Sequence, residues 1–299
     1  FRIYPVAYIG PSGRSPTGPL HFGSLIAALA SFLDARANHG QWLLRIEDLD
    51  PPREQADVKA QFPAVLSKFG LYWDGEICRQ SDRHHAYQDV LEHLLAQHQA
   101  YRCNCSRKEI LARCGSTLYD RHCLYHPPSA EAQCAIRVKC DNMPRHFNDT
   151  IQGRYISPNS SGGDFVVYRR DHLYAYLLAV VVDDYHQGVT HVVRGSDLLA
   201  ETTRQIHLQQ VLGYPTPTYA HIPVANNPQG QKLSKQTFAP ALTLDDTVPL
   251  LFKALLFLDQ QPPTELLEAS RDEIIRWGIE HWQIDRVSPT LAKPVELSK

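Results

Sequence analysis

A short stretch near the N-terminus constrains the fold of this chain more than any other. Residues 15–24 read Ser-Pro-Thr-Gly-Pro-Leu-His-Phe-Gly-Ser, between an apolar segment at 6–10 and a run with helical periodicity. A strand, a turn and a helix start can direct backbone N–H groups and an imidazole at a polyphosphate. Gly23 lets a nucleotide approach the backbone closely. A proline-rich turn before an ordinary helix would read the same way, so the motif alone leaves both interpretations open.

The pattern then continues as the beginning of a doubly wound α/β domain. The helix is predicted to end at residues 38–40, and a strand follows at 42–46, directly before Glu47, Asp48 and Asp50. Ligands of such sheets bind beyond the carboxyl ends of the strands, so the motif and the acidic cluster should share one crevice. The acidic residues could cap the next helix or contact an ammonium or ribose group. Glu47 is the best binding candidate because it directly follows the strand.

The α/β pattern resumes in the second half of the chain. Strands are predicted at 165–168, 190–194 and 221–225, with helices over 174–184 and after 195–197. Arg194 ends a strand and is placed for the same crevice, although an arginine there could equally form a surface ion pair. Tyr176 lies on a helix face that would ordinarily be core.

Composition restricts the class of protein. The chain has 299 residues, a net charge of -2 and a pI near 6.8, which argues against a protein that coats nucleic acid by bulk positive charge. Any RNA contact should use a local patch, and Arg107, Lys108 and Arg113 are candidates. The longest apolar runs fall short of the roughly 18 residues of a membrane helix, and the first residues lack a signal-peptide pattern. We therefore expect a soluble cytoplasmic enzyme without a membrane partner, as a monomer.

Residues 101–163 differ from their surroundings in cysteine, proline and basic content. Cys103, Cys105, Tyr119 and Cys123 can offer three thiolates and a phenol to one zinc ion, which would replace the core that so short a region cannot build. Cys114 competes for the fourth position because thiolate is the commoner zinc ligand. His122 and His126 are weaker competitors, and a group of free buried cysteines is the alternative to a metal site.

These observations divide the chain into three parts. A discontinuous Rossmann-like catalytic domain is predicted over 1–100 and 164–236, with an inserted zinc-binding subdomain at 101–163. Residues 237–299 form a short helical segment.

A second motif, Lys-Leu-Ser-Lys-Gln, stands at residues 232–236 after a glycine-containing turn. Two lysines in such a loop can follow a pyrophosphate as charge builds on it in the transition state. Taken alone this is a weak signal, since any exposed loop can carry two lysines.

Together the two motifs resemble the paired signatures of class I aminoacyl-tRNA synthetases in their glutamyl branch. Residues 45–48, 72–74, 80–83 and 193–198 are also similar to that branch. The chain ends too soon for the anticodon-binding region of a complete glutamyl-tRNA synthetase, and the Cys-x-Cys with Tyr-x3-Cys resembles the short glutamyl-queuosine tRNA(Asp) synthetase family. The resemblance implies activation of L-glutamate by ATP with Mg2+, without tRNA, and transfer to queuosine in the anticodon of tRNA(Asp). A truncated glutamyl-tRNA synthetase charging a 3' end, and a non-catalytic zinc-stabilised RNA-binding paralogue, stay open as alternatives.

The resemblance also assigns roles to individual residues. It implies catalytic roles for His21 and Lys235 and a structural, closed zinc site. The implied ligands of ATP are Thr17, His21, Gly23, Ser24, Lys232, Ser234 and Lys235; those of glutamate are Gly13, Arg14, Ser15, Glu47, Tyr176 and Arg194; those of zinc are Cys103, Cys105, Tyr119 and Cys123.

One departure from the family pattern falls just before the first motif. The family usually reads Arg-Phe-Ala-Pro before Ser-Pro, whereas residues 11–14 here are Pro-Ser-Gly-Arg. Either the loop is re-registered so that Arg14 meets the substrate carboxylate, or glutamate binding is weakened.

Overall fold

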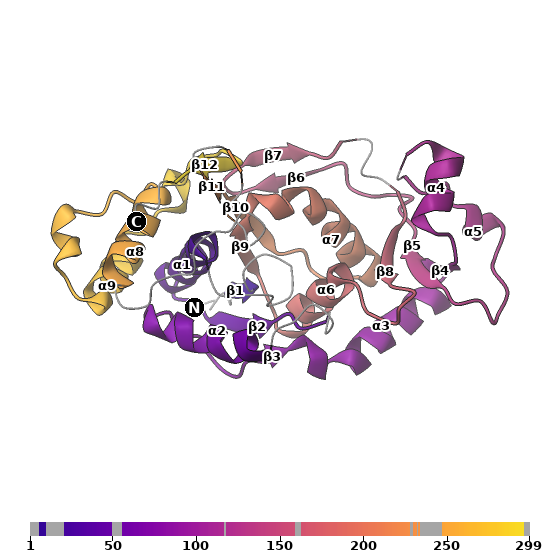
Figure 1. Ribbon diagram of the computed structural model, residues 1–299, viewed down its shortest axis with the longest axis horizontal. Helices are drawn as coiled ribbons and strands as arrows, with labels where there is room; N and C mark the ends of the chain where they lie inside the picture. Colours follow the sequence, from indigo (N-terminus) through magenta and orange to yellow (C-terminus); the bar gives the residue numbers. More distant parts are fainter. Residues whose placement is uncertain are drawn as a thin grey trace.

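The molecule is elongated, with its C-terminal helices at one end and its cysteine-rich elements at the other (Figure 1). The computed structural model describes residues 6–9, 21–49, 56–116, 118–158, 163–227, 230–231, 233 and 247–295. Within these ranges no helix combines the length and the apolar character needed to cross a membrane.

A large sheet forms the centre of the described chain and has the predicted doubly wound topology. Its strands are, in spatial order, β3 (Cys78–Arg79), β2 (Trp42–Ile46), β1 (Val6–Ile9), β9 (His191–Gly195), β10 (Thr218–Ile222), β6 (His146–Asp149) and β7 (Gly153–Ile156). All neighbours are parallel except β6 and β7. The chain runs outward from β1 through β2 to β3 and later returns to the other side of β1 as β9 and β10. The switch point, where ligands of such sheets bind, therefore lies between β1 and β9.

Helix α1 (Phe22–Ala37) is the buried centre of one core. The predicted apolar face is buried, and the helix ends at Asn38 as expected. Residues off that face are buried as well, because α8 (Thr247–Phe257) and α9 (Arg271–His281) cover the side turned away from the sheet. Even Asp34 is buried, and its carboxylate accepts a hydrogen bond from Trp282 Nε1 at 3.0 Å.

The other helices complete the layers and connections. Helix α2 (Ala56–Lys68) continues through Pro63. Two short strands, β11 and β12, pair in parallel beside the main sheet. The remaining bounds are α2 (Ala56–Lys68), α3 (His84–Ala96), α4 (Arg107–Cys114), α5 (His122–Tyr125), α6 (Tyr176–His186), α7 (Leu199–Leu212), β11 (Val224–Asn226), β12 (Ala292–Pro294) and the 3-10 helices Gln80–Asp82, Ser196–Leu198, Thr264–Leu267 and Ile284–Arg286.

The strands divide differently from the predicted ranges 101–163 and 164–236. A small antiparallel sheet contains β4 (Ala100–Cys103), β5 (Ala135–Val138) and β8 (Phe165–Tyr168), although β8 was expected in the catalytic domain. Conversely, β6 and β7 fall inside the predicted insertion but extend the large sheet beyond β10. The composition of residues 101–163 sets this region apart from its surroundings. Composition does not specify which distant strand each of its segments pairs with.

Candidate active site

The predicted crevice lies at the carboxyl ends of β1, β2 and β9. Glu47 directly follows β2, Arg194 lies near the end of β9, and Tyr176 is the first residue of α6. Several predicted ligands lie outside the described residues, so their placement stays a prediction. They are Gly13, Arg14, Ser15, Thr17, Lys232, Ser234 and Lys235.

His21 caps the N-terminus of α1. Its Nδ1 accepts a hydrogen bond from the Ser24 backbone N–H at 3.2 Å, and its ring also contacts the Ser24 hydroxyl. Gly23 has no side chain. A Cβ at this position would lie 3.2 Å from His21 Nδ1 and 3.8 Å from the Leu233 carbonyl oxygen. Because Leu233 belongs to the second motif, the glycine step of the first motif and the centre of the lysine motif lie close together. The helix N-terminus adds its positive dipole end to this place.

Arg194 is buried and held on several sides. Its Nε donates to His221 Nε2 at 3.0 Å, and its Nη2 donates to Thr202 Oγ1 at 2.8 Å and to Gln205 Oε1 at 2.7 Å. The guanidinium also lies over the ring of Tyr219, with 5.2 Å from its central carbon to the ring centre. The structure rules out the alternative of a surface ion pair for this arginine.

Among the residues that the structure describes, three predicted glutamate ligands each present a buried polar atom without a hydrogen-bond partner. These atoms are Glu47 Oε1, Tyr176 Oη and Arg194 Nη1. Such orphans are rare in folded proteins and require an explanation, such as a ligand. An acidic, a neutral and a basic group together match a substrate with an ammonium group and carboxylates.

The charges of these groups act on one another. Burial raises the pKa of Glu47 to about 8, and the positive charges of Arg45 and Arg194 oppose that rise. Burial also raises the pKa of the Tyr176 hydroxyl, an effect that the charge of Glu47 increases and that of Arg194 opposes. A cation bound beside Glu47 would lower its pKa and favour the ionised carboxylate.

Sequence reasoning missed the polar layer beneath Glu47. Arg45 is 1% exposed and pairs with Asp184 at 2.7 Å and with Gln187 at 2.7 Å. Asp183 accepts hydrogen bonds from three side chains in the segment that follows β3: Gln80, Arg83 and Tyr87. Two adjacent aspartates inside the apolar helix α6 were the available signal, since buried carboxylates require partners.

Three sulfur atoms converge at the far end of the molecule. The Sγ atoms of Cys103, Cys105 and Cys123 all lie within 4.8 Å of one another, and Cys114 is not part of that group. The Tyr119 hydroxyl lies 3.2 Å from Cys103 Sγ and 3.6 Å from Cys105 Sγ. It also accepts a hydrogen bond from the Cys123 backbone N–H at 2.8 Å. The three thiols and one phenol are thus grouped around one point.

Two guanidinium groups face the same sulfur atoms. Arg137 Nε donates to Cys103 Sγ at 3.3 Å while its guanidinium stacks on the Tyr119 ring, and Arg113 Nη2 donates to Cys105 Sγ at 3.3 Å. Burial raises the pKa of the Cys105 thiol, and the hydrogen bonds of Tyr119 and Arg113 oppose that rise.

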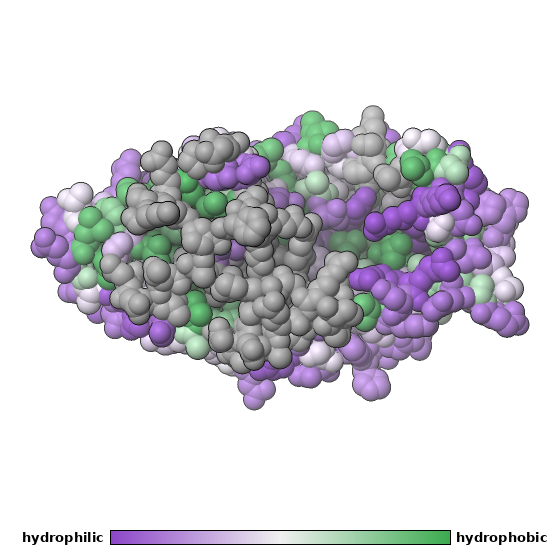
Figure 2. Space-filling model, in the orientation of Figure 1, coloured by the Kyte–Doolittle hydropathy of each residue, from purple (hydrophilic) through white to green (hydrophobic). Residues whose placement is uncertain are grey.

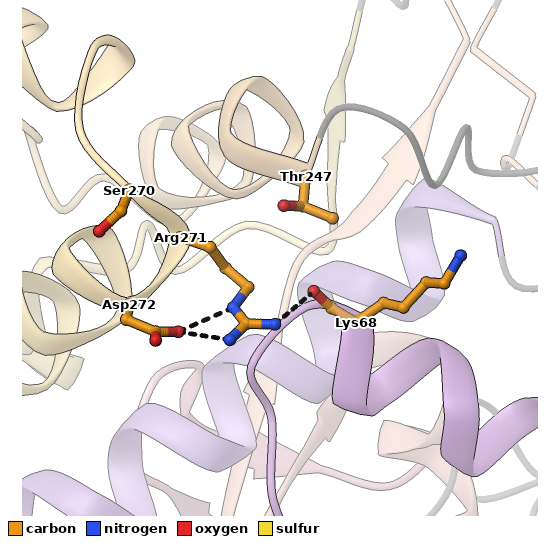
Figure 3. A pocket seen from close by; sticks show the side chains of 5 residues that line it. All are labelled: Lys68, Thr247, Ser270, Arg271 and Asp272. Atoms are coloured by element: carbon orange, nitrogen blue, oxygen red, sulfur yellow. Dashed lines mark hydrogen bonds and ion pairs between the residues drawn. The ribbon is translucent and has the colours of Figure 1, made fainter.

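A hollow of about 460 Å³ lies elsewhere, among the ends of α2, α8 and α9 (Figure 3). Its lining residues are Lys68, Thr247, Ser270, Arg271 and Asp272. Arg271 is already paired with Asp272 and donates to the Lys68 carbonyl oxygen at 3.2 Å. This hollow is separate from the switch point and brings together no group that the predicted chemistry needs.

Known proteins agree with this geometry. The family model described as tRNA synthetases class I (E and Q), catalytic domain, matches residues 13–246. A glutamate-tRNA synthetase from Elizabethkingia anophelis superposes with a TM-score of 0.81 at 23% identity, covering 99% of this chain and 68% of that one. The chain therefore contains a class I synthetase catalytic domain.

Closer relatives narrow the family. A glutamyl-Q tRNA(Asp) synthetase of Pseudomonas fluorescens is 48% identical over 96% of both chains. The protein of that name from Thiobacillus denitrificans is 48% identical over 97% of this chain and 99% of its own, and that from Vibrio cholerae is 46% identical over 95% and 93%. This chain belongs to the glutamyl-Q tRNA(Asp) synthetases.

Proposed function

We propose that this protein activates L-glutamate with ATP and Mg2+ in the absence of tRNA, then transfers it to queuosine in the anticodon of tRNA(Asp). The observation that carries the proposal is the set of orphaned buried atoms on Glu47, Tyr176 and Arg194 at the switch point. Glu47 would pair with the substrate ammonium group, and Arg194 would direct its remaining N–H donor at a carboxylate. Tyr176 would supply a neutral hydrogen bond between them.

The chemistry needs positioning and charge neutralisation more than covalent help. A glutamate carboxylate oxygen attacks the α-phosphorus of ATP, the bond to the bridging oxygen breaks, and pyrophosphate leaves with the electron pair. Thr17, His21, Gly23, Ser24, Lys232 and Ser234 would hold the nucleotide, and Lys235 would neutralise the departing pyrophosphate. In the second step a queuosine hydroxyl attacks the mixed anhydride, and AMP leaves.

The cysteine cluster fits a structural zinc ion. Cys103, Cys105, Cys123 and the Tyr119 oxygen supply four ligand atoms of suitable chemistry, whereas Cys114 lies outside the converging group. A site with four protein ligands leaves no open position for substrate, so bound zinc would stabilise the fold around it. Arg113 and Arg137 would balance the excess negative charge of the thiolates.

Zinc content should distinguish the two candidates for the fourth ligand. We expect Cys105→Ser to lose zinc and Cys114→Ser to keep about one zinc per chain. Tyr119→Phe should release zinc to a chelator at least about tenfold more readily, because one of four ligands is gone. Mass-spectrometric metal analysis after graded chelator treatment measures this. Zinc retention by Tyr119→Phe together with loss from Cys114→Ser would reverse the assignment.

The cysteine-rich end also offers a surface suited to RNA. Figure 2 shows that the visible face at the end carrying α4 and α5 is largely hydrophilic. Arg107 and Lys108 are exposed at the start of α4, while Arg113 is engaged by Asp120 at 2.7 Å. We therefore propose Arg107 and Lys108 for phosphate contacts, which set the position of the RNA without reading its sequence.

Glutamate-dependent ATP/pyrophosphate exchange without tRNA tests the first step. Exchange would exclude a non-catalytic paralogue, and its absence at high enzyme and glutamate concentrations in a folded protein would overturn the proposal. Mapping radiolabelled glutamate to the anticodon fragment of tRNA(Asp) tests the second step. Label at the 3' end would instead indicate a truncated glutamyl-tRNA synthetase.

Glutamate affinity should rise with pH between 6 and 8. The pKa of Glu47 in the free protein is about 8, and binding an ammonium group requires the ionised carboxylate. Below pH 8 binding must release a proton, so affinity should fall by up to about tenfold per pH unit. Calorimetric Kd values at pH 6, 7, 8 and 9 measure this, and Glu47→Gln should bind weakly with no such slope. A Kd that is constant from pH 6 to 8 would contradict the role of Glu47.

A further inference from the structure

A buried row of three side chains runs from β6 through β10 to β9. Asp149 Oδ2 lies 2.5 Å from His221 Nδ1, and His221 Nε2 lies 3.0 Å from Arg194 Nε. Sheet register places His221 directly beside Arg194 and Tyr219 directly beside Asp149. The side chains of Asp149 and His221 are 0% exposed. The predicted site residues included only Arg194, so two of the three groups are without an assigned role.

Hydrogen bonding fixes where the protons lie in this row. Asp149 Oδ1 accepts hydrogen bonds from the backbone N–H groups of His221, Ile151 and Gln152 at 3.1, 3.0 and 2.9 Å. Burial raises the pKa of Asp149, but these donors and His221 together hold it below its usual value. An ionised Asp149 can only accept, so His221 Nδ1 carries the proton.

The second nitrogen of His221 is then an acceptor. Burial lowers the pKa of His221 to about 4, with Arg194 contributing in the same direction and Asp149 opposing. The ring is neutral at pH 7 and has no proton on Nε2. That nitrogen accepts the Arg194 Nε–H, and Thr202 and Gln205 accept from Nη2. Within the described part of the chain Nη1 has no hydrogen-bond partner, and the fixed plane of the guanidinium sets its direction.

We propose that Asp149 and His221 are positioning residues that orient Arg194 toward a substrate carboxylate. This inference rests on the proposed glutamate activation. Asp149 accepts the proton of His221 Nδ1 and so leaves Nε2 as an acceptor for the N–H of Arg194 Nε. Because the guanidinium is planar, fixing Nε also fixes the direction of Nη1. A flexible buried arginine would lose this orientation and the geometric benefit of its fork.

Asp149→Asn is the sharpest substitution, because it keeps the shape of the side chain. Three backbone N–H groups require its Oδ1, so the new amide N–H2 must face His221 Nδ1. That nitrogen would then have to accept, Nε2 would carry the proton, and two N–H groups would oppose each other at Arg194 Nε. We expect Kd for glutamate to rise about 10- to 100-fold, with KM for ATP changing less than about twofold.

Substitutions of His221 test the same row from its middle. His221→Leu removes the acceptor and should match the effect of Asp149→Asn, whereas His221→Gln can place an amide oxygen near Arg194 Nε and should recover most of the affinity. The Asp149→Asn/His221→Leu double variant should be no worse than either single variant, because the row is already broken. If the two residues had only a structural role, their losses of thermal stability would add in the double variant. The glutamate Kd and the KM for ATP would then change to a similar extent.

Calorimetry with glutamate and pyrophosphate exchange supply the readouts, with thermal unfolding as the check on folding. Asp34→Asn is the matched control. Asp34 is a buried carboxylate on α1 that accepts a hydrogen bond from Trp282, and it is not part of the row. The substitution should leave the glutamate Kd within about twofold.

The outcomes separate this inference from the proposed function. Glutamate binding by the unmodified protein, with an unchanged Kd in Asp149→Asn and His221→Leu, would overturn only the positioning role. Absence of binding by the unmodified protein would overturn both. If Asp149→Asn does not fold, the comparison of His221→Leu with His221→Gln decides, and equal glutamate Kd values in the two would reject the role.

Discussion

Replacing Arg194 by lysine should raise the Kd for glutamate by about a hundredfold or more. A lysine ammonium is one donor centre and cannot reach His221, Thr202, Gln205 and a substrate carboxylate at once, as the guanidinium fork can. The substitution also leaves His221 Nε2 buried without its donor, which adds to the loss. Isothermal titration with glutamate at pH 8 measures the effect.

The control for Arg194→Lys is Arg276→Lys. Arg276 is exposed on α9, at the end of the molecule formed by the C-terminal helices. The Arg276→Lys variant should bind glutamate as the unmodified protein does. If Arg194→Lys bound glutamate within a few-fold of the unmodified protein, the carboxylate would have to be held elsewhere.

Replacing Lys235 by alanine should slow ATP/pyrophosphate exchange by about 10²- to 10³-fold, the usual effect of removing one group that stabilises transition-state charge. Lys235 itself lies outside the described residues. Leu233 of the same motif lies close to Gly23, beside His21, which supports a position near the nucleotide. Because the lysine acts mainly when charge builds on the pyrophosphate, kcat should fall more than KM for ATP rises.

Steady-state exchange at varied ATP concentration separates these two quantities. Lys68→Ala is the control, since Lys68 is an exposed lysine at the end of α2. An unchanged exchange rate in Lys235→Ala would remove the second motif from the catalytic mechanism.

Local patterns were sufficient for much of the fold. Strands β1, β2 and β9 are short apolar runs that end in turn or charged residues, and α1 carries a clear helical period between a glycine step and Asn38. The strand predicted at 221–225 was wrong in its bounds, because Pro223, which cannot donate to a sheet, separates β10 from β11. Since parallel strands joined by helices form doubly wound sheets, the crevice could be placed before the structure was known. Glu47 and Arg194 could be proposed as ligands because each stands at the carboxyl end of a predicted strand.

The groups that support the site could not be predicted in the same way. Asp149 and His221 are 72 positions apart in the sequence, and only the pairing of β6 with β10 makes them neighbours. No local pattern around either residue indicates that pairing. Asp183 and Asp184 gave a local signal as charges within an apolar helix, but their partners Gln80, Arg83 and Arg45 come from distant elements.

The choice between Tyr119 and Cys114 was also beyond the sequence. Both residues lie in the same short region, and thiolate is the more frequent metal ligand. Cys114 is not one of the three converging sulfur atoms, whereas the Cys123 backbone N–H donates to the Tyr119 oxygen, which lies beside the sulfur atoms of Cys103 and Cys105. Spacing alone does not encode this arrangement.

The order of the strands between β5 and β8 has a consequence for how this protein can be divided. The chain leaves the small sheet after β5, adds β6 and β7 to the edge of the large sheet, and returns to the small sheet as β8. The cysteine-rich end is therefore not a cassette that one excision could remove or one graft could transfer. Any recombination that exchanged it as a single block would also remove Asp149, and with it the support of Arg194 two strands away in the large sheet.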